Sequence, residues 1–168
     1  MKKNKKPKMI INDFKKIFKT RSKQLHTPIF IGNEIKYLKE CIKTSYVSYV
    51  GEFVKKFEKK ISQYTKSNFS VALNSGTAAL HLILHYLNVN EKNEILLPSL
   101  TYVATANAVK YCNAEPNFVD IEKKTLGVCP IKLEKYLKKI CIFKNGKTIN
   151  KYKKKELKAL IVVHLYGF

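Results

Sequence analysis

A serine, a glycine and a threonine are adjacent at Ser75, Gly76 and Thr77, where a short apolar run is followed by an amphipathic helical pattern. A helix that begins there directs its free backbone N–H groups and the positive end of its dipole toward its start. Gly76 would let an anion approach the backbone, and the two hydroxyl groups would add hydrogen-bond donors. The segment therefore predicts a phosphate site, although it matches neither the Walker loop nor the glycine-rich dinucleotide pattern. An ordinary helix N-cap formed by Ser75 or Thr77 is equally compatible with the spacing.

Tyr102 occupies a similar place, after the next predicted strand and at the start of the next predicted helix. If both helices begin at the same sheet edge, its ring can stack on a flat ligand that is held at Ser75–Thr77. Ordinary packing at a helix start is the alternative. Asp120 ends a further strand, where we expect it to cap the following turn or to orient a site.

Hydroxyl groups also gather in the segment SYVSYVG, which begins at Ser45 and ends at Gly51. Its residues 46–50 read as a β-rich patch between two helices, closed by Gly51. The hydroxyls of Ser45, Tyr46 and Ser48 either face a ligand or form a polar strand edge. The sequence alone leaves both interpretations open.

Short apolar strands and amphipathic helices alternate from about residue 69 onward and would position these groups. We expect buried strands at 69–73, 94–97, 117–120 and 159–163, helices at 77–88, 101–112 and 130–140, and a hairpin turn at Asn145-Gly146. Two helices are expected before them, from residue 33 and around 53–64, and part of 1–27 as a short helix. Such alternation predicts an α/β fold with a mostly parallel sheet, whose binding loops share one edge.

The composition limits the classes of partner. The 168 residues include 33 basic and 12 acidic ones, a net charge of +21, yet Arg21 is the only arginine. Proteins that read nucleic acid rely on the planar fork of arginine, so the charge supports nucleic-acid binding only weakly. No apolar run approaches the ~20 residues of a membrane span, so we expect no membrane partner and a cytoplasmic location. No cysteine pair has CxxC spacing, and Leu82 rather than Glu follows His81, so we expect reduced thiols and no metal site.

Five segments in order carry a family resemblance: SYVSYVGEFVKKFE, NSGTAALHL, LPSLTYVATANAV, AEPNFVDI and VVHLYGF. Together they resemble the N-terminal part of the DegT/StrS family of pyridoxal-phosphate sugar aminotransferases. The stretch from Phe143 onward also looks like the subgroup that makes precursors of legionaminic acid and related amino sugars. Residues 1–27 are then a basic N-terminal segment, and residues 28–168 the first, incomplete part of a fold-type I large domain.

The resemblance implies roles for the residues singled out above. The phosphate of pyridoxal 5'-phosphate would be held by Ser75, Gly76 and Thr77. Tyr102 would stack on its pyridine ring. The substrate end would be built in part by Ser45, Tyr46 and Ser48, across the interface of a homodimer in the full-length form. The resemblance further implies a nucleotide-linked 4-keto-6-deoxy sugar as substrate, glutamate as amino donor, and a role in surface glycan or polysaccharide biosynthesis.

The sequence departs from the family pattern at its end. The family carries a carboxylate for the pyridine nitrogen and a Schiff-base lysine, and both follow the HLYGF-like segment at which this sequence stops. We therefore expect no catalytic residue within the 168 residues, and no transamination by this chain alone. Two alternatives remain: a catalytically inactive remnant or binding protein of the same fold, and a basic nucleic-acid-binding protein.

Overall fold

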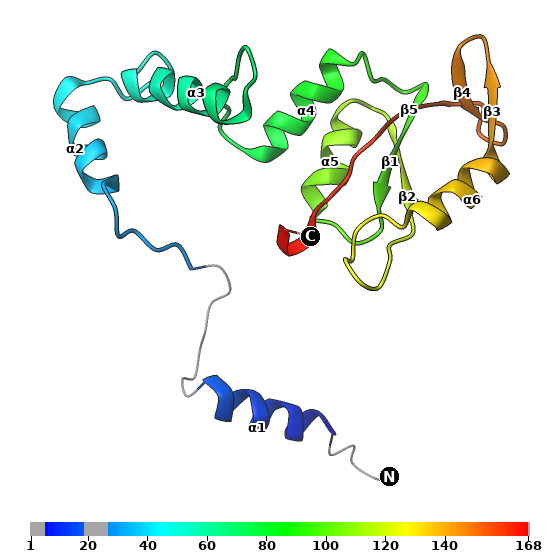
Figure 1. Ribbon diagram of the computed structural model, residues 1–168, viewed down its shortest axis with the longest axis horizontal. Coiled ribbons are helices and arrows are strands. Elements are labelled where there is room, and N and C mark those ends of the chain that lie inside the picture. Colours follow the sequence, from blue (N-terminus) through cyan, green and yellow to red (C-terminus); the bar gives the residue numbers. More distant parts are fainter. Residues whose placement is uncertain (1–5, 19–26, 168) are drawn as a thin grey trace. The chain divides into compact units, whose positions relative to one another are not determined.

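A computed structural model describes residues 6–18 and 27–167, and the chain divides into two compact units at Lys66 (Figure 1). The described residues of the first unit form three helices: α1 (Lys6–Phe18), α2 (Glu34–Thr44) and α3 (Glu52–Thr65). The rings of Tyr37 and Phe53 lie 5.0 Å apart, centroid to centroid, and join α2 to α3. These three helices confirm the helical predictions for this part of the chain.

The segment between α2 and α3 is a turn, so the expected β-rich patch at residues 46–50 is wrong. Ser45 ends α2 with a left-handed backbone (φ 62°), and the chain then folds back on itself. The N–H of Val47 donates to the Ser45 carbonyl at 3.1 Å, and the N–H of Gly51 donates to the Ser48 carbonyl at 3.0 Å. Local bonds of this kind use the backbone groups that a strand would need, which is why β-propensity alone misled.

The second unit is an α/β layer built on one mixed sheet. Its strands are β1 (Asn93–Pro98), β2 (Glu115–Val119), β3 (Cys141–Lys144), β4 (Lys147–Asn150) and β5 (Glu156–Leu160), in the spatial order β2-β1-β5-β4-β3. Strands β2, β1 and β5 are parallel, and β4 pairs antiparallel with both β3 and β5. Both residues of the Asn145-Gly146 turn have positive φ, 52° and 74°, as a two-residue hairpin loop requires. The expected fold class is confirmed, with an antiparallel hairpin added at one edge.

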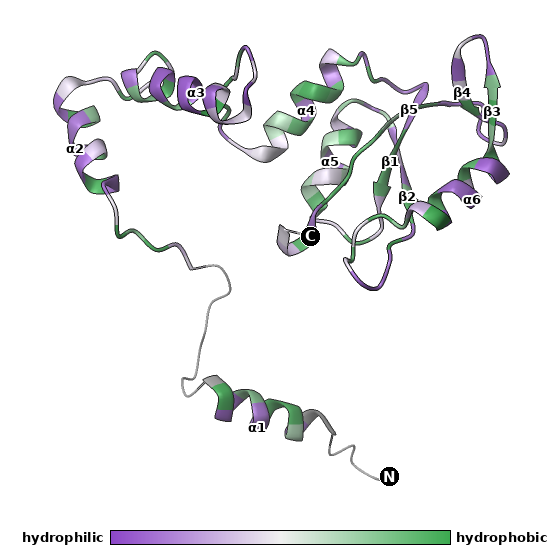
Figure 2. Cartoon of the chain, in the orientation of Figure 1, coloured by the Kyte–Doolittle hydropathy of each residue, from purple (hydrophilic) through white to green (hydrophobic). Residues whose placement is uncertain are grey.

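Helices α4 (Gly76–Tyr86), α5 (Val103–Tyr111) and α6 (Pro130–Ile140) complete this unit, and a short 3-10 turn (Leu165–Gly167) follows β5. All three helices begin and end close to their predicted positions. The core lies between the sheet and the α4–α5 pair, which pack on one another. It consists of Leu84, Val89, Ile95, Ala108, Val109, Cys112 and Ala114. Every residue of β1 is buried, and Figure 2 shows hydrophobic residues in β1 and β5 as well as in α4.

Two strand predictions need correction. Residues 69–73 are not a strand, and Phe69, Val71 and Leu73 are 88%, 69% and 43% exposed rather than buried. A strand is stabilised by pairing and by a covering layer, and the five strands of the described sheet do not include this segment. The last strand covers 156–160 instead of 159–163, because its pairing with β1 starts where Asn93 faces Glu156. It is only half buried, with Leu160 38% exposed.

Candidate functional site

The Ser75–Thr77 segment lies at the start of α4, as predicted. Ser75 is the N-cap residue, with an extended backbone, and its Oγ accepts the N–H of Ala78 at 3.2 Å. Its carbonyl accepts the N–H of Ala79 at 3.1 Å. The N-cap interpretation is therefore correct for Ser75, and it leaves the hydroxyl proton available. That hydroxyl lies 3.5 Å from Asn74 Oδ1, a long contact that a stronger acceptor could replace.

The backbone at Gly76 and Thr77 is open to a ligand. Their N–H groups belong to the first turn, so no carbonyl within α4 can accept from them. A Cβ built on Gly76 meets no atom within 4 Å, and the φ of Gly76 is not in the left-handed region. The fold itself therefore does not require glycine here. A glycine that the fold can spare is useful when another molecule must come close to the backbone.

Tyr102 is the N-cap residue of α5 and is 78% exposed. The turn before it is held by the Thr101 and Thr105 hydroxyls, 2.8 Å apart, and by the Ser99 N–H, which donates to Val119 at 2.9 Å. The ring of Tyr102 is thus presented on a fixed turn at the carboxyl end of β1. Convergence of Tyr102 and Thr77 on one ligand remains a prediction, supported by the packing of α4 against α5.

The hydroxyl patch lies in the first unit, in the α2–α3 turn. Tyr46 and Ser48, but not Ser45, line an open, mostly apolar pocket of about 280 Å³ between these helices. A Cβ on Gly51 would lie 3.2 Å from the carbonyl oxygens of both Ser48 and Tyr46, so a side chain here would crowd the backbone of this turn. The turn can present Tyr46 and Ser48 to a ligand.

Asp120 follows β2 and forms an ion pair with Lys132 of α6, at 3.2 Å between Oδ2 and Nζ. Both side chains are more than half exposed, so the pair is weak. His81 packs edge-on against Tyr111, with ring centroids 5.6 Å apart, in keeping with a packing role.

The buried Glu94 is a residue that the sequence interpretation missed. Its side chain is fully buried in β1, and its Oε2 accepts from Asn150 Nδ2 at 2.8 Å and from Asn117 Nδ2 at 3.4 Å. Its Oε1 receives no hydrogen bond from the described residues but lies 3.0 Å from Lys153 Nζ as an ion pair. Tyr136 extends the network by donating to Asn117 Oδ1 at 2.9 Å. One carboxylate thus ties β1, β2 and β4 to the turn that precedes β5.

Electrostatics at this network follow from Lys153. Lys153 hydrogen-bonds Glu115, and this bond holds the pKa of the Glu115 carboxyl below its ordinary value. Lys155, 3.2 Å from the other Glu115 oxygen, lowers that pKa further. The carboxylates of Glu115 and Glu94 raise the pKa of Lys153. Since Glu94 is the second residue of β1, this network lies at the amino end of the strand and stabilises the sheet rather than a site at its carboxyl edge.

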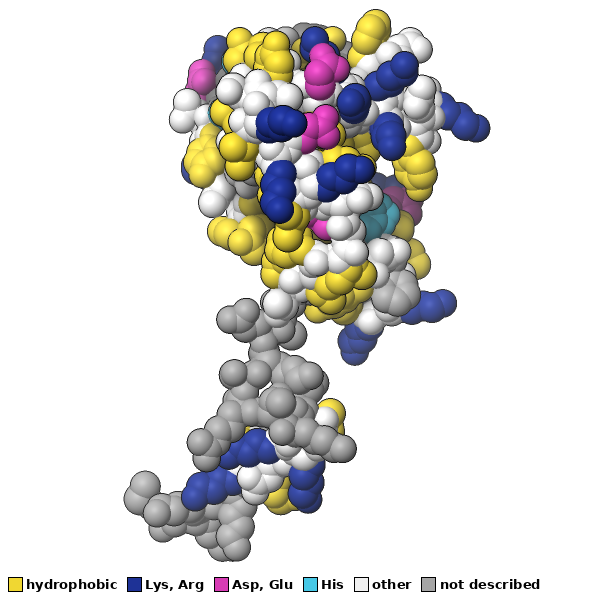
Figure 3. All heavy atoms as spheres, turned by 90° about the vertical axis from the view of Figure 1, so that its left-hand side faces the viewer, with side chains coloured by type: hydrophobic (Ala, Val, Ile, Leu, Met, Phe, Trp, Pro, Cys, Tyr) yellow, Lys and Arg dark blue, Asp and Glu magenta, His cyan; other side chains and the backbone are white. Residues whose placement is uncertain are grey.

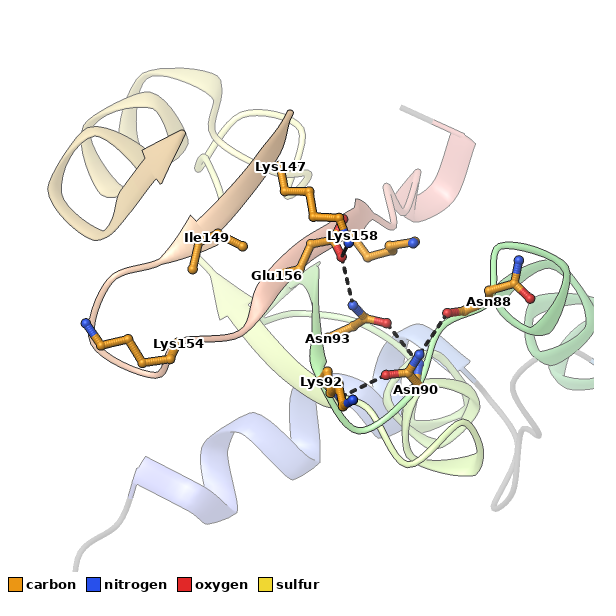
Figure 4. A pocket seen from close by; sticks show the side chains of 9 residues that line it. All are labelled: Asn88, Asn90, Lys92, Asn93, Lys147, Ile149, Lys154, Glu156 and Lys158. Carbon is orange, nitrogen blue, oxygen red and sulfur yellow. Dashed lines mark hydrogen bonds and ion pairs between the residues drawn. The ribbon is translucent and has the colours of Figure 1, made fainter. Parts of the chain in front are cut away.

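The open pocket in Figure 4 lies at the same amino edge, because Asn93 and Glu156 are the first residues of β1 and β5. It measures about 380 Å³ and is lined by four lysines, Lys92, Lys147, Lys154 and Lys158. Lys147 is already paired with Glu156 at 3.2 Å, and the other ammonium groups point in different directions. This arrangement provides no convergent set of donors, so we do not assign the functional site to it.

Comparison with known proteins matches residues 28–168 to the model of the DegT/DnrJ/EryC1/StrS aminotransferase family. The GDP-perosamine synthase of Caulobacter vibrioides is 37% identical over 140 residues, which cover 83% of this chain and 33% of that protein. The spore coat polysaccharide biosynthesis protein SpsC of Bacillus subtilis is 35% identical over 107 residues, 64% of this chain and 27% of that protein.

Among solved structures, a DegT DnrJ EryC1 StrS aminotransferase from Brucella abortus superposes with a TM-score of 0.69 at 27% identity, over 81% of this chain and 34% of that one. The chain thus spans about a third of the length of these relatives. The matched region begins after α1 and includes α4, α5 and the whole sheet.

Proposed function

The chain belongs to the DegT/DnrJ/EryC1/StrS aminotransferase family, and we propose that residues 28–168 supply the phosphate-binding part of a nucleotide-sugar aminotransferase. The family depends on pyridoxal 5'-phosphate. The observation that carries the proposal is the open helix start at Ser75–Thr77, which falls inside the family match. The relatives that make GDP-perosamine and spore coat polysaccharide support a nucleotide sugar as substrate and a place in polysaccharide biosynthesis.

The residues present fit the cofactor. The Gly76 and Thr77 N–H groups and the α4 dipole would bind its phosphate, and the Ser75 hydroxyl would donate a further hydrogen bond while its oxygen still caps the helix. The exposed ring of Tyr102 would stack on the pyridine. Bound pyridoxal phosphate supplies the ring that carries the amino group from donor to acceptor.

The finer assignments extend this proposal. The amino acceptor would be a nucleotide-linked 4-keto-6-deoxy sugar, and glutamate would be the amino donor. Tyr46 and Ser48 would contribute to the sugar site from the α2–α3 turn, with Ser45 shaping that turn through its left-handed backbone. The net charge of +21 would attract the nucleoside diphosphate of such a substrate.

The phosphate site is tested with 4-deoxypyridoxine 5'-phosphate, which keeps the ring and phosphate but lacks the aldehyde. The aldehyde must be avoided because it would react with many of the chain's 32 lysines. We expect a titration followed by amide NMR to shift the Gly76, Thr77 and Ala78 signals, and 4-deoxypyridoxine without phosphate to leave them unchanged. Shifts confined to scattered surface lysines would contradict the site.

The reaction is tested separately. The protein encoded by the longest open reading frame that contains this chain is incubated with pyridoxal phosphate, ¹⁵N-glutamate and GDP-4-keto-6-deoxymannose. Transfer of ¹⁵N to the sugar, read by mass spectrometry, supports the substrate class. Transfer of ¹⁵N to keto acids but not to a nucleotide sugar would support the aminotransferase activity and refute the proposed substrate class.

A further inference from the structure

Helix α1 lies outside the family match, so the proposed function gives it no role. The charge of the chain is concentrated around it. Residues 1–27 contain ten basic residues and one acidic residue, a net charge of +9 out of the chain's +21. One sixth of the sequence thus carries more than two fifths of the net charge. A uniform lysine-rich background would not concentrate charge in this way.

The helix is also strongly amphipathic. With 100° per residue, Ile10, Ile11, Phe14 and Ile17 fall within one arc of about 120°. Their side chains are 56%, 52%, 57% and 71% exposed. The opposite side carries Lys8, Asn12, Lys15 and Lys16. Apolar and basic side chains both reach the surface in Figure 3. Around α1, the three isoleucines and Phe14 lie on one side, whereas these three lysines lie on the other side together with Met9 and Asn12.

We propose that α1 binds the chain to an anionic membrane surface, lying parallel to it. A helix with an apolar stripe and a lysine-rich polar side buries the stripe at the boundary between headgroups and acyl chains, while the lysines contact anionic headgroups. At 13 residues, α1 is about 20 Å long, which is ample for this placement. The charge complementarity commits the partner to anionic lipid, because a neutral surface would leave the ten basic residues without a role.

The expectation of no membrane partner was based on the lack of a spanning run, and an interfacial helix needs no such run. Among the described residues, no helix is long and apolar enough to cross a membrane. Nucleic acid would bind the lysines equally well, but its phosphates make no favourable contact with the apolar stripe. The apolar stripe is therefore the feature that separates the two partners.

The test is co-sedimentation of the full chain with vesicles of phosphatidylcholine alone or with about a third phosphatidylserine. The decisive variant is Ile10→Ser/Ile17→Ser, which weakens the stripe without changing charge. Its matched control is Met9→Ser/Asn12→Ser, on the polar side of the same helix. Since the chain has no tryptophan, Phe14→Trp adds a single tryptophan, which can be excited apart from the ten tyrosines and whose emission reports insertion.

We expect binding to the anionic vesicles and a blue shift of the Phe14→Trp emission. The stripe variant should bind about tenfold more weakly, and the control within about twofold of the unmodified chain. Lys15→Gln/Lys16→Gln should also weaken binding, and added salt should weaken it further. Equal binding by the stripe variant and the control would overturn the proposal in favour of non-specific charge, as would equal binding to neutral vesicles. Self-association that the stripe variant abolishes, without vesicle binding, would assign the stripe to a second copy and also overturn it.

Discussion

Replacement of the buried Glu94 by glutamine should destabilise the second unit strongly, although the two side chains have nearly the same shape. Glutamine keeps an acceptor for Asn150 but places an amide near the Lys153 ammonium, which now lies 3.0 Å from a carboxylate oxygen. Removing one partner of a buried ion pair costs about 3–5 kcal/mol. Lys153 is 46% exposed and keeps Glu115 as a partner, so the lower end applies, about 3 kcal/mol.

The assay is urea unfolding followed by far-UV circular dichroism. With a denaturant dependence of about 1.5 kcal/mol per molar urea, the midpoint should fall by about 2 M. The matched control is Glu134→Gln, which removes an exposed ion pair with Lys138 on α6 and should cost about 0.5 kcal/mol or less. The double variant Glu94→Gln/Lys153→Gln should lose less unfolding free energy than the sum of the two single losses, because each substitution removes the same interaction. Equal loss from Glu94→Gln and Glu134→Gln would refute the claim that a desolvated charge holds β1 in place.

Three further predictions concern the same chain. The lowered pKa of Glu115 implies stability that is present above the carboxyl's unfolded pKa and is lost as pH falls through the folded one; the raised pKa of Lys153 implies stability that is lost only as pH rises through its folded pKa. When unfolding free energy is plotted against pH, Glu115→Gln should therefore reduce the loss of stability at acid pH. An unchanged loss would contradict a stabilising interaction between Glu115 and Lys153. Gly76→Ala should leave the free energy of unfolding in urea unchanged within about 0.5 kcal/mol yet weaken 4-deoxypyridoxine 5'-phosphate binding about tenfold, whereas Gly51→Ala should lower the free energy of unfolding by about 1 kcal/mol or more because its Cβ meets two carbonyls at 3.2 Å. Residues 1–168 with pyridoxal phosphate, glutamate and the keto sugar should yield no amino sugar, and a borohydride-trapped adduct at one defined lysine together with product would contradict this.

Helices and the hairpin were predictable because their signals are local. Apolar residues three and four apart place α4 and α6, and an alanine-rich run places α5, within a few residues of their observed bounds. Asn145-Gly146 fixes the β3–β4 turn through two positive φ angles that few other residue pairs adopt. Each of these elements needs only its own residues to be recognised.

Strands were less predictable because they depend on distant partners. Residues 46–50 and 69–73 have the composition of strands, yet neither pairs within the described sheet. The same reason hid Glu94, whose amide partners are 23 and 56 residues away in sequence. Its only signal in the sequence was a charge at the start of an apolar strand. That signal does not predict which residues contact Glu94, namely Asn117, Asn150 and Lys153. The start of α4 was predictable as an open helix end, whereas its use for a phosphate rests on the family.

The strand order has a consequence for how this chain folds during synthesis. Strand β5 lies between β1 and β4 in the sheet but is the last of the five described strands to be made. At about 5–20 residues per second, the roughly 60 residues between the ends of β1 and β5 take about 3–12 s to emerge from the ribosome. The β3–β4 hairpin can close within microseconds of its appearance, whereas one edge of β1 waits for a partner across that interval. Fast codons between β1 and β5 would shorten the time in which this edge is open to misassembly or to a chaperone.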